Sequence, residues 1–328
     1  MKMLPEKYKH LGRLVGLLCL VWIFFTFNVG VVVRAWADLD GTIIGRAFLL
    51  SLSMLLLKFV RWHVLLRINQ YRLPLMSSLS IYGSGMFWGL VSPGRMGEFS
   101  RCFVLKQHFG IPYSQSAALI IFDRLYDLLF IVMACLSGWL VLTDRVFFLG
   151  PMFLLVLLGM MFVKKGSFHF IFRRLKGFLT RFGLPVDVQY FREMIARNLS
   201  LKALIPGLLT GASVAVMVTQ GYFLAADGYG LHFTVLQILC IVTTFSLSTL
   251  VPLSIFGIGT NEITLLALVY TWLPEFYHPE KLIAFSLSLG MINFIPSIVG
   301  SGFLAMLCHV IISQGWCSKS ASMEAKGK

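Results

Sequence analysis

Long runs of apolar residues dominate the chain, and most are long enough to cross a bilayer as a helix. A spanning helix needs about 20 predominantly apolar residues. Six runs meet this length, at residues 12–33, 43–66, 113–142, 146–163, 203–226 and 281–313. The first run follows several lysines, as in a secretory signal, but it exceeds the roughly 7–15 apolar residues of a signal core. We therefore expect it to remain as a helix.

Two further apolar regions are interrupted by helix-breaking residues. Residues 76–110 are broken at Pro93 and Gly94, with Gly97 just beyond, and residues 233–273 are broken by Pro252, Gly257 and Gly259. Proline removes a backbone donor and glycine loosens a helix, so each region predicts two half-helices joined by non-helical backbone. Ordinary kinked helices are the alternative. The predicted fold class is an all-α polytopic membrane protein with about six full transmembrane helices and two broken or re-entrant helical hairpins.

Composition supports a membrane protein. The 328 residues are 58% hydrophobic and 13% charged, and the mean hydropathy is +0.83. Soluble domains average roughly 45–50% apolar and about 25% charged residues. This composition excludes a cytosolic enzyme, a disordered chain and a secreted disulfide scaffold. We expect residues 1–328 to form a single transmembrane domain with no soluble catalytic domain.

Basic residues predict the orientation. Lys and Arg number 28 against 14 Asp and Glu, and they gather at both termini, around Arg61 to Arg72, and in residues 164–202. Such clusters stay on the cytoplasmic side, so we expect a multi-pass protein of the bacterial inner membrane with both termini in the cytoplasm. Residues 164–202 mix apolar and basic positions, which favours an amphipathic cytoplasmic linker or, alternatively, a solvated loop. Both broken regions must then return to the side they entered, which predicts a possible inverted repeat.

Charged residues inside apolar runs are the candidate functional residues, because a charge near the bilayer centre costs about 2.5–3.5 kcal/mol. Arg95, Glu98 and Arg101 are spaced by three, so Glu98 can pair with either arginine on one helix face. The surplus positive charge suits a lipid phosphate, which a guanidinium binds through two hydrogen bonds. The alternative is an ion-paired hairpin base at the interface.

A second group of charges interrupts the run at 113–142. Asp123 lies roughly 15 Å into this helix at about 1.5 Å per residue, and Asp127 shares its face. Two acids this close need a cation to remain ionised, which Arg101 or Arg124 could supply. The interpretation is a functional site that also includes Arg124, or an internal structural ion pair.

A fourth acid, Glu262, follows the second break, where a glycine-containing loop either binds a phosphate or forms a tight helix junction.

Trp62 and Trp88 fit interfacial aromatic belts. The histidines and cysteines have no metal-ligand spacing, and no nucleotide-binding motif is present. The sequence therefore predicts no catalytic residue, no metal, no cofactor and no nucleic-acid partner.

The run Pro93-Gly94-Arg95-Met96-Gly97-Glu98-Phe99-Ser100-Arg101 and the later Asp123-Arg124-Leu125-Tyr126-Asp127 resemble the lysylphosphatidylglycerol synthase transmembrane, or flippase-like, family. Pro252, Gly257, Gly259 and Glu262 are similar to its second signature, and Arg61-Trp62 also fits. Asp123 replaces the usual glutamate. The chain resembles a membrane-domain-only form, because the aminoacyl-transferase domain of the full synthase is missing.

The resemblance implies movement of a lipid between leaflets rather than enzymatic synthesis. We expect the substrate to be an anionic phospholipid, a polyprenyl-phosphate-linked lipid or a hopanoid-type lipid, with Arg95, Arg101 and Arg124 contacting the phosphate. Envelope-biosynthesis enzymes are possible partners. Two alternatives are a membrane-embedded transferase, or glycosyltransferase subunit, acting on a polyprenyl-phosphate lipid, and a non-catalytic envelope scaffold.

Overall fold

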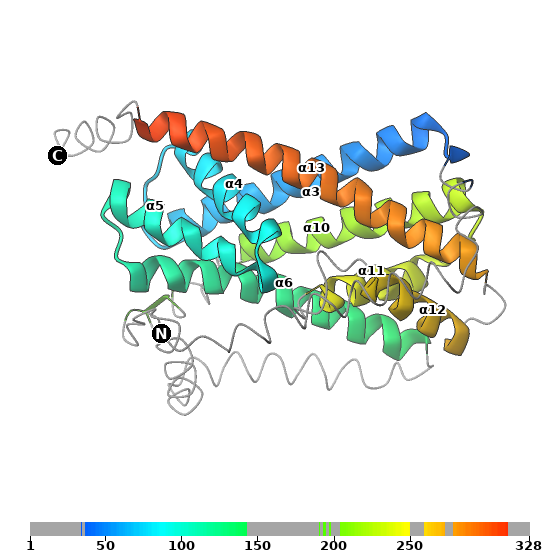
Figure 1. Cartoon of the computed structure of the whole chain (residues 1–328). Helices are drawn as coiled ribbons and strands as arrows, with labels where there is room; N and C mark the ends of the chain where they lie inside the picture. The colour runs from blue at the N-terminus through cyan, green and yellow to red at the C-terminus, as the bar shows by residue number, and fades with distance from the viewer. Residues whose placement is uncertain are drawn as a thin grey trace, which may run out of the picture.

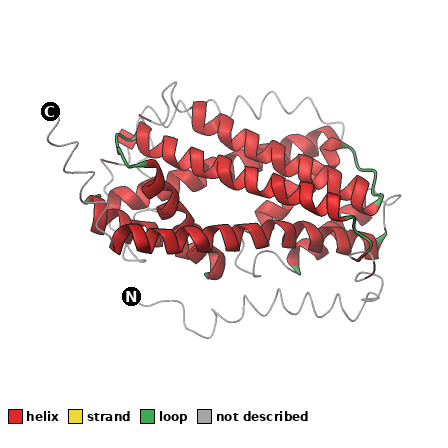
Figure 2. Ribbon diagram, turned by 90° about the horizontal axis from the view of Figure 1, so that it is seen from above, coloured by secondary structure: helices red, strands yellow, loops and turns green. Residues whose placement is uncertain are grey.

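The computed structural model describes residues 37–142, 204–249, 259–272 and 278–313, together with Arg34, Tyr190, Glu193, Met194 and Arg197. Every regular element in these residues is a helix (Figure 2). Helices at Gly41–Ile68, Leu204–Gly228 and Pro279–Val310 are long and apolar enough to cross a membrane. The predicted all-helical class is therefore confirmed for the described residues. The expected spans at 12–33 and 146–163, and most of the linker at 164–202, lie outside them.

Four long helices coincide with predicted spans to within three residues at each end. They are α3 (Gly41–Ile68), α6 (Tyr113–Leu142), α10 (Leu204–Phe223) and α13 (Pro279–Ser313). Asp40 sets the start of α3 by accepting a hydrogen bond from the backbone N–H of Thr42, as an N-cap residue does. A short π-helical segment, η4 (Leu224–Gly228), extends α10.

The first predicted hairpin is present. It consists of α4 (Leu75–Val91), a 3-10 helix η1 (Pro93–Phe99) and α5 (Ser100–Phe109). The break is thus a tight 3-10 segment rather than non-helical backbone. The Ser92 hydroxyl accepts a hydrogen bond from the Gly97 N–H at 2.6 Å. A side chain at Gly97 would collide with the backbone carbonyl of Trp88, so glycine permits η1 to lie directly against α4.

The second region also contains two separate helices. They are α11 (Val235–Ser248), which begins at a capping box formed by Thr234 and Gln237, and α12 (Thr260–Trp272). The predicted interruption is confirmed by these helix ends, whereas Pro252 and Gly257 lie outside the described residues.

Helix contacts follow a paired pattern. The two long helices α3 and α10 pack against each other, α4 packs against α13, and α11 packs against α6. The first helix of each hairpin therefore contacts the long helix that follows the other hairpin, and the two hairpins enter the bundle from opposite ends (Figure 1).

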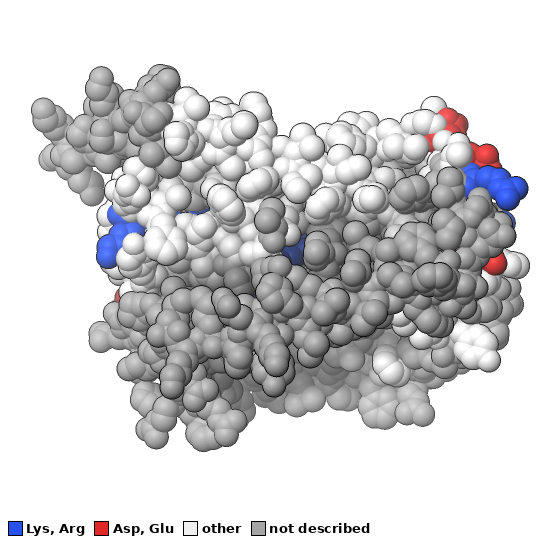
Figure 3. All heavy atoms as spheres, viewed as in Figure 1, with Lys and Arg blue, Asp and Glu red and all other residues white. Residues whose placement is uncertain are grey.

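The outer surface suits a lipid environment. Large apolar side chains are exposed along the long helices, including Leu49 on α3, Leu208 on α10 and Met306 on α13 at 65%, 72% and 73%. In the view of Figure 3, most of the visible charged side chains lie at the two ends of the molecule. Burying such a surface in hydrocarbon removes it from water, so the fold is that of a multi-pass membrane protein.

Candidate functional site

Charged side chains from four elements meet inside the helix bundle. Each of the acids Glu98, Asp123 and Asp127 forms an ion pair with an arginine, and the arginines involved are Arg61, Arg101 and Arg124. These six side chains are called the ion-pair network below. Because it contains three positive and three negative charges, the network is neutral overall.

Arg61 on α3 holds the two aspartates of α6. Its Nη2 lies 2.8 Å from Asp123 Oδ1 and donates to Asp127 Oδ2 at 3.0 Å. Its Nη1 also donates to Asp127 and, at 3.1 Å, to the hydroxyl of Thr210 on α10. Arg61 is 1% exposed. The grouping of Arg61 with the loop bases around Arg72 was therefore wrong, because its side chain points into the bundle to pair with α6.

Arg101 on α5 is fully buried at 0% exposure. Its Nη2 donates to Glu98 at 2.8 Å, and its Nη1 lies 3.5 Å from Asp123 Oδ2. Its guanidinium carbon lies 4.7 Å from the ring centre of Trp62 and 4.8 Å from that of Tyr82. Cation–π contacts are strengthened where water is excluded. The expected interfacial position of Trp62 was wrong, because this ring is also completely buried.

Two glycines of α4 provide the space for these charged side chains. A Cβ at Gly85 would lie 2.4 Å from Arg101 Cγ, and one at Gly89 would lie 2.5 Å from Glu98 Cγ. The glycines are four residues apart, on one helix face. They let Arg101 and Glu98 approach the α4 backbone.

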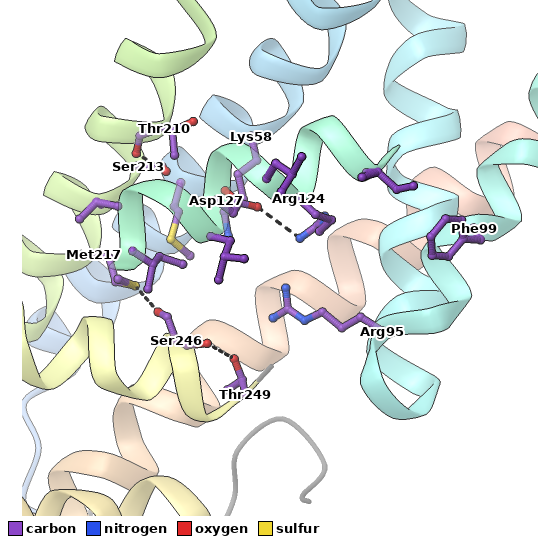
Figure 4. Close-up of a pocket in the computed structure, with 16 residues that line it drawn as sticks. Lys58, Arg95, Phe99, Arg124, Asp127, Thr210, Ser213, Met217, Ser246 and Thr249 are labelled. Carbon is purple, nitrogen blue, oxygen red and sulfur yellow. Dashed lines mark hydrogen bonds and ion pairs between the residues drawn. The ribbon is translucent and has the colours of Figure 1, made fainter. Parts of the chain in front are cut away.

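Arg124 connects the network to a cavity. Its Nε lies 2.6 Å from Glu98 Oε2 and its Nη1 lies 3.3 Å from Asp127 Oδ2. Its side chain is 27% exposed, more than any other member of the network. Arg124 and Asp127 form part of the wall of a cavity of about 300 Å³, together with Lys58 and Arg95 (Figure 4).

Lys58 and Arg95 bring further positive charge to this cavity. Neither side chain forms a hydrogen bond or ion pair with another residue of the described segments. Figure 4 shows the Arg95 guanidinium directed into the cavity from η1. Arg95 has a φ of 56°, a left-handed conformation that is uncommon for a residue other than glycine. Such strained backbone persists where surrounding structure holds it in place, often at functional sites.

A second cavity of about 120 Å³ shares Lys58, Arg95, Ser246 and Thr249 with the first. It continues between α4, α11 and α13, where Asn293 forms part of its wall. Positive side chains thus stand where the two hairpins approach the centre of the bundle.

The predicted first group of charges is divided by the structure. Arg95 lines the larger cavity, whereas Arg101 and Glu98 do not. Glu98 pairs with Arg101 and Arg124, and no ion pair joins it to Arg95.

Glu262 lies apart from the arginines. Its carboxylate accepts hydrogen bonds from the Gly259 N–H at 2.6 Å and from the Ser286 hydroxyl of α13 at 2.8 Å. It is 2% exposed and forms no ion pair with a described residue. This geometry favours the helix-junction alternative, in which the acid caps the start of α12.

Long apolar helices, two interrupted hairpins and a charged interior define a multi-pass helical membrane protein with a polar internal site. The chain belongs to the lysylphosphatidylglycerol synthase TM region family, whose sequence profile matches residues 10–300. Membership of this family indicates a lipid-related function in a membrane. Searches for similar curated proteins and for similar solved structures gave no match.

Proposed function

We propose that this protein moves an anionic lipid between the two leaflets of the bacterial inner membrane. The observation that carries this proposal is the cavity containing Lys58 and Arg95, neither of which forms an ion pair or hydrogen bond with a described acid. A charge inside a membrane protein is costly and marks a substrate pathway or a binding site. An anionic headgroup would supply the missing partner.

The phosphate would contact Lys58, Arg95 and Arg124, the three basic side chains of the cavity wall. Guanidinium groups suit this role because they donate paired hydrogen bonds to phosphate oxygens. In this proposal Arg61 and Arg101 serve the site indirectly. They form ion pairs with the acids that would otherwise compete with the lipid phosphate for the bases of the cavity wall. The proposal keeps Arg95 and Arg124 from the sequence-based assignment and replaces Arg101, which does not line the cavity, with Lys58.

We further propose that the two hairpins are inverted repeats. The paired helix contacts support this, since exchanging α4 with α11 and α13 with α6 leaves the pattern unchanged. A likeness in backbone conformation between the two hairpins also supports the inverted repeat. Arg95 and Gly259 both have left-handed backbone, with φ of 56° and 87°, and each lies three residues before a buried glutamate, Glu98 or Glu262. Transporters built from such repeats bind substrate at the repeat interface and move one repeat against the other.

The test is lipid translocation by purified protein in liposomes that contain fluorescent phosphatidylglycerol. Translocation is followed by quenching of the outer leaflet, and Arg95→Asn is compared with wild type. Asparagine tolerates left-handed backbone, so this variant removes the charge and keeps the turn. We expect wild-type protein to translocate the lipid and the variant to lose most of that activity. Wild-type translocation no faster than in protein-free liposomes contradicts the proposal.

A further inference from the structure

The net charge of the cavity wall indicates how much negative charge a bound lipid phosphate should carry. Since the ion-pair network is neutral, Arg124 and Asp127 add no net charge to the cavity wall. Lys58 and Arg95 then contribute two positive charges. Among the described residues that line either cavity, Asp127 is the single acid, and Arg61 and Arg124 already hold it.

Lipid phosphates differ in the charge they carry. A phosphodiester, as in phosphatidylglycerol, has one negative charge near neutral pH. A phosphate monoester carries about −1.5 to −2, because its second pKa is near 6. Of these two classes, the monoester dianion is the one that carries enough charge to neutralise both bases, and an unpaired buried charge is unfavourable.

The cavity dimensions are consistent with a small headgroup. A volume of about 300 Å³ lies at the lower limit of the roughly 300–1,000 Å³ typical of ligand sites. Two apolar lining residues on α6, Leu125 and Leu128, are 44% and 40% exposed. The cavity wall thus continues onto the apolar outer surface of α6, along which an acyl or prenyl chain can lie while the phosphate occupies the cavity.

We infer that the site selects a lipid phosphate monoester, with Lys58 and Arg95 acting as the pair that recognises its second negative charge. This inference rests on the proposed function and narrows its substrate class. Lys58 is the specificity-determining residue, because the single negative charge of a phosphodiester is already neutralised by Arg95.

The test measures binding in mixed detergent micelles through the ligand-induced rise in the unfolding midpoint of the full chain. The probes are dioleoyl phosphatidic acid (a monoester), dioleoyl phosphatidylglycerol (a diester) and inorganic phosphate. At pH 7, where the monoester is mainly a dianion, we expect phosphatidic acid to bind about tenfold more tightly than phosphatidylglycerol, since one further charge-assisted contact is made. At pH 5, where the monoester has lost its second charge, the preference should disappear.

Variants of α3 isolate the contribution of the lysine. Lys58→Met should weaken phosphatidic acid binding about tenfold more than phosphatidylglycerol binding and so abolish the preference, while Lys58→Arg should retain the preference. Arg46→Met removes a basic side chain from the exposed surface of the same helix and should change neither.

The outcomes separate the two proposals. Equal binding of the two lipids by wild-type protein overturns the monoester inference and leaves anionic-lipid transport intact. Binding of neither lipid overturns both proposals. Inorganic phosphate binding as tightly as phosphatidic acid overturns the lipid assignment, because the site would then recognise a soluble ion.

Discussion

Removing the Arg61 side chain is the most informative perturbation of the interior. Arg61→Met keeps a long side chain of similar shape in α3 but deletes the five donor contacts to Asp123, Asp127 and Thr210. Asp123 would retain Arg101 and Arg124 at 3.5 Å each. The network would change from neutral to a net charge of −1.

The size of the effect follows from burial. Removing one partner of a buried ion pair typically costs about 3–5 kcal/mol, because it leaves an uncompensated charge. Arg61 is 1% exposed and Asp123 is 0% exposed, so the full penalty applies. Arg61→Lys keeps the charge but loses the planar fork that binds two carboxylates at once. We expect it to cost about 1–2 kcal/mol, equivalent to one or two lost hydrogen bonds.

Thermal unfolding of the purified protein in detergent measures these differences. Arg61→Met should lower the midpoint by several degrees, and Arg61→Lys should lower it less. The double variant Arg61→Met/Asp127→Asn restores neutrality and should be more stable than the sum of the single effects predicts. An Arg61→Met midpoint equal to that of wild type would refute the network as a stabilising element. Strict additivity in the double variant would refute the coupling between Arg61 and Asp127.

Two further predictions use matched pairs. Gly85→Ala should destabilise the protein by about 1–3 kcal/mol through overpacking against Arg101. The matched variant Gly45→Ala in α3, where a Cβ would have nothing within 4 Å, should be neutral or stabilising by up to about 1 kcal/mol. Equal unfolding midpoints for the two variants would argue against the close approach of Arg101 to Gly85. Glu98→Gln leaves two arginines without their carboxylate and should destabilise by about 3 kcal/mol or more. Glu262→Gln should cost about 1 kcal/mol, because an amide can still hydrogen-bond Gly259 and Ser286; a larger loss for this variant than for Glu98→Gln would contradict the assigned partners.

The helices could be predicted from the sequence because span length is a local property. Runs of apolar residues gave the bounds of α6 and nearly those of α3, and Pro93 located the first break. A local pattern also identified Glu98, Asp123, Asp127 and Arg124, since each charge lies inside an apolar run.

The pairing of these charges could not be predicted, because it depends on which helices become neighbours. Arg61 and Asp123 are 62 residues apart, and Arg61 near the end of an apolar run is indistinguishable from a loop base. Lys58 was missed for a related reason, since a single lysine in a span commonly extends its amine to the interface. The sequence did contain one signal for the buried position of Arg101 and Glu98. Gly85 and Gly89 are four residues apart, and this spacing leaves room for large side chains against one face of α4.

The most direct test of the central claim is lipid translocation by the double variant Lys58→Met/Arg95→Asn in liposomes, alongside wild type and Arg46→Met. Unfolding midpoints measured on the same samples establish that all three proteins are folded. The account predicts that wild type and Arg46→Met translocate the fluorescent anionic lipid and that the folded double variant does not. Translocation by the double variant at the wild-type rate would contradict a path through this cavity.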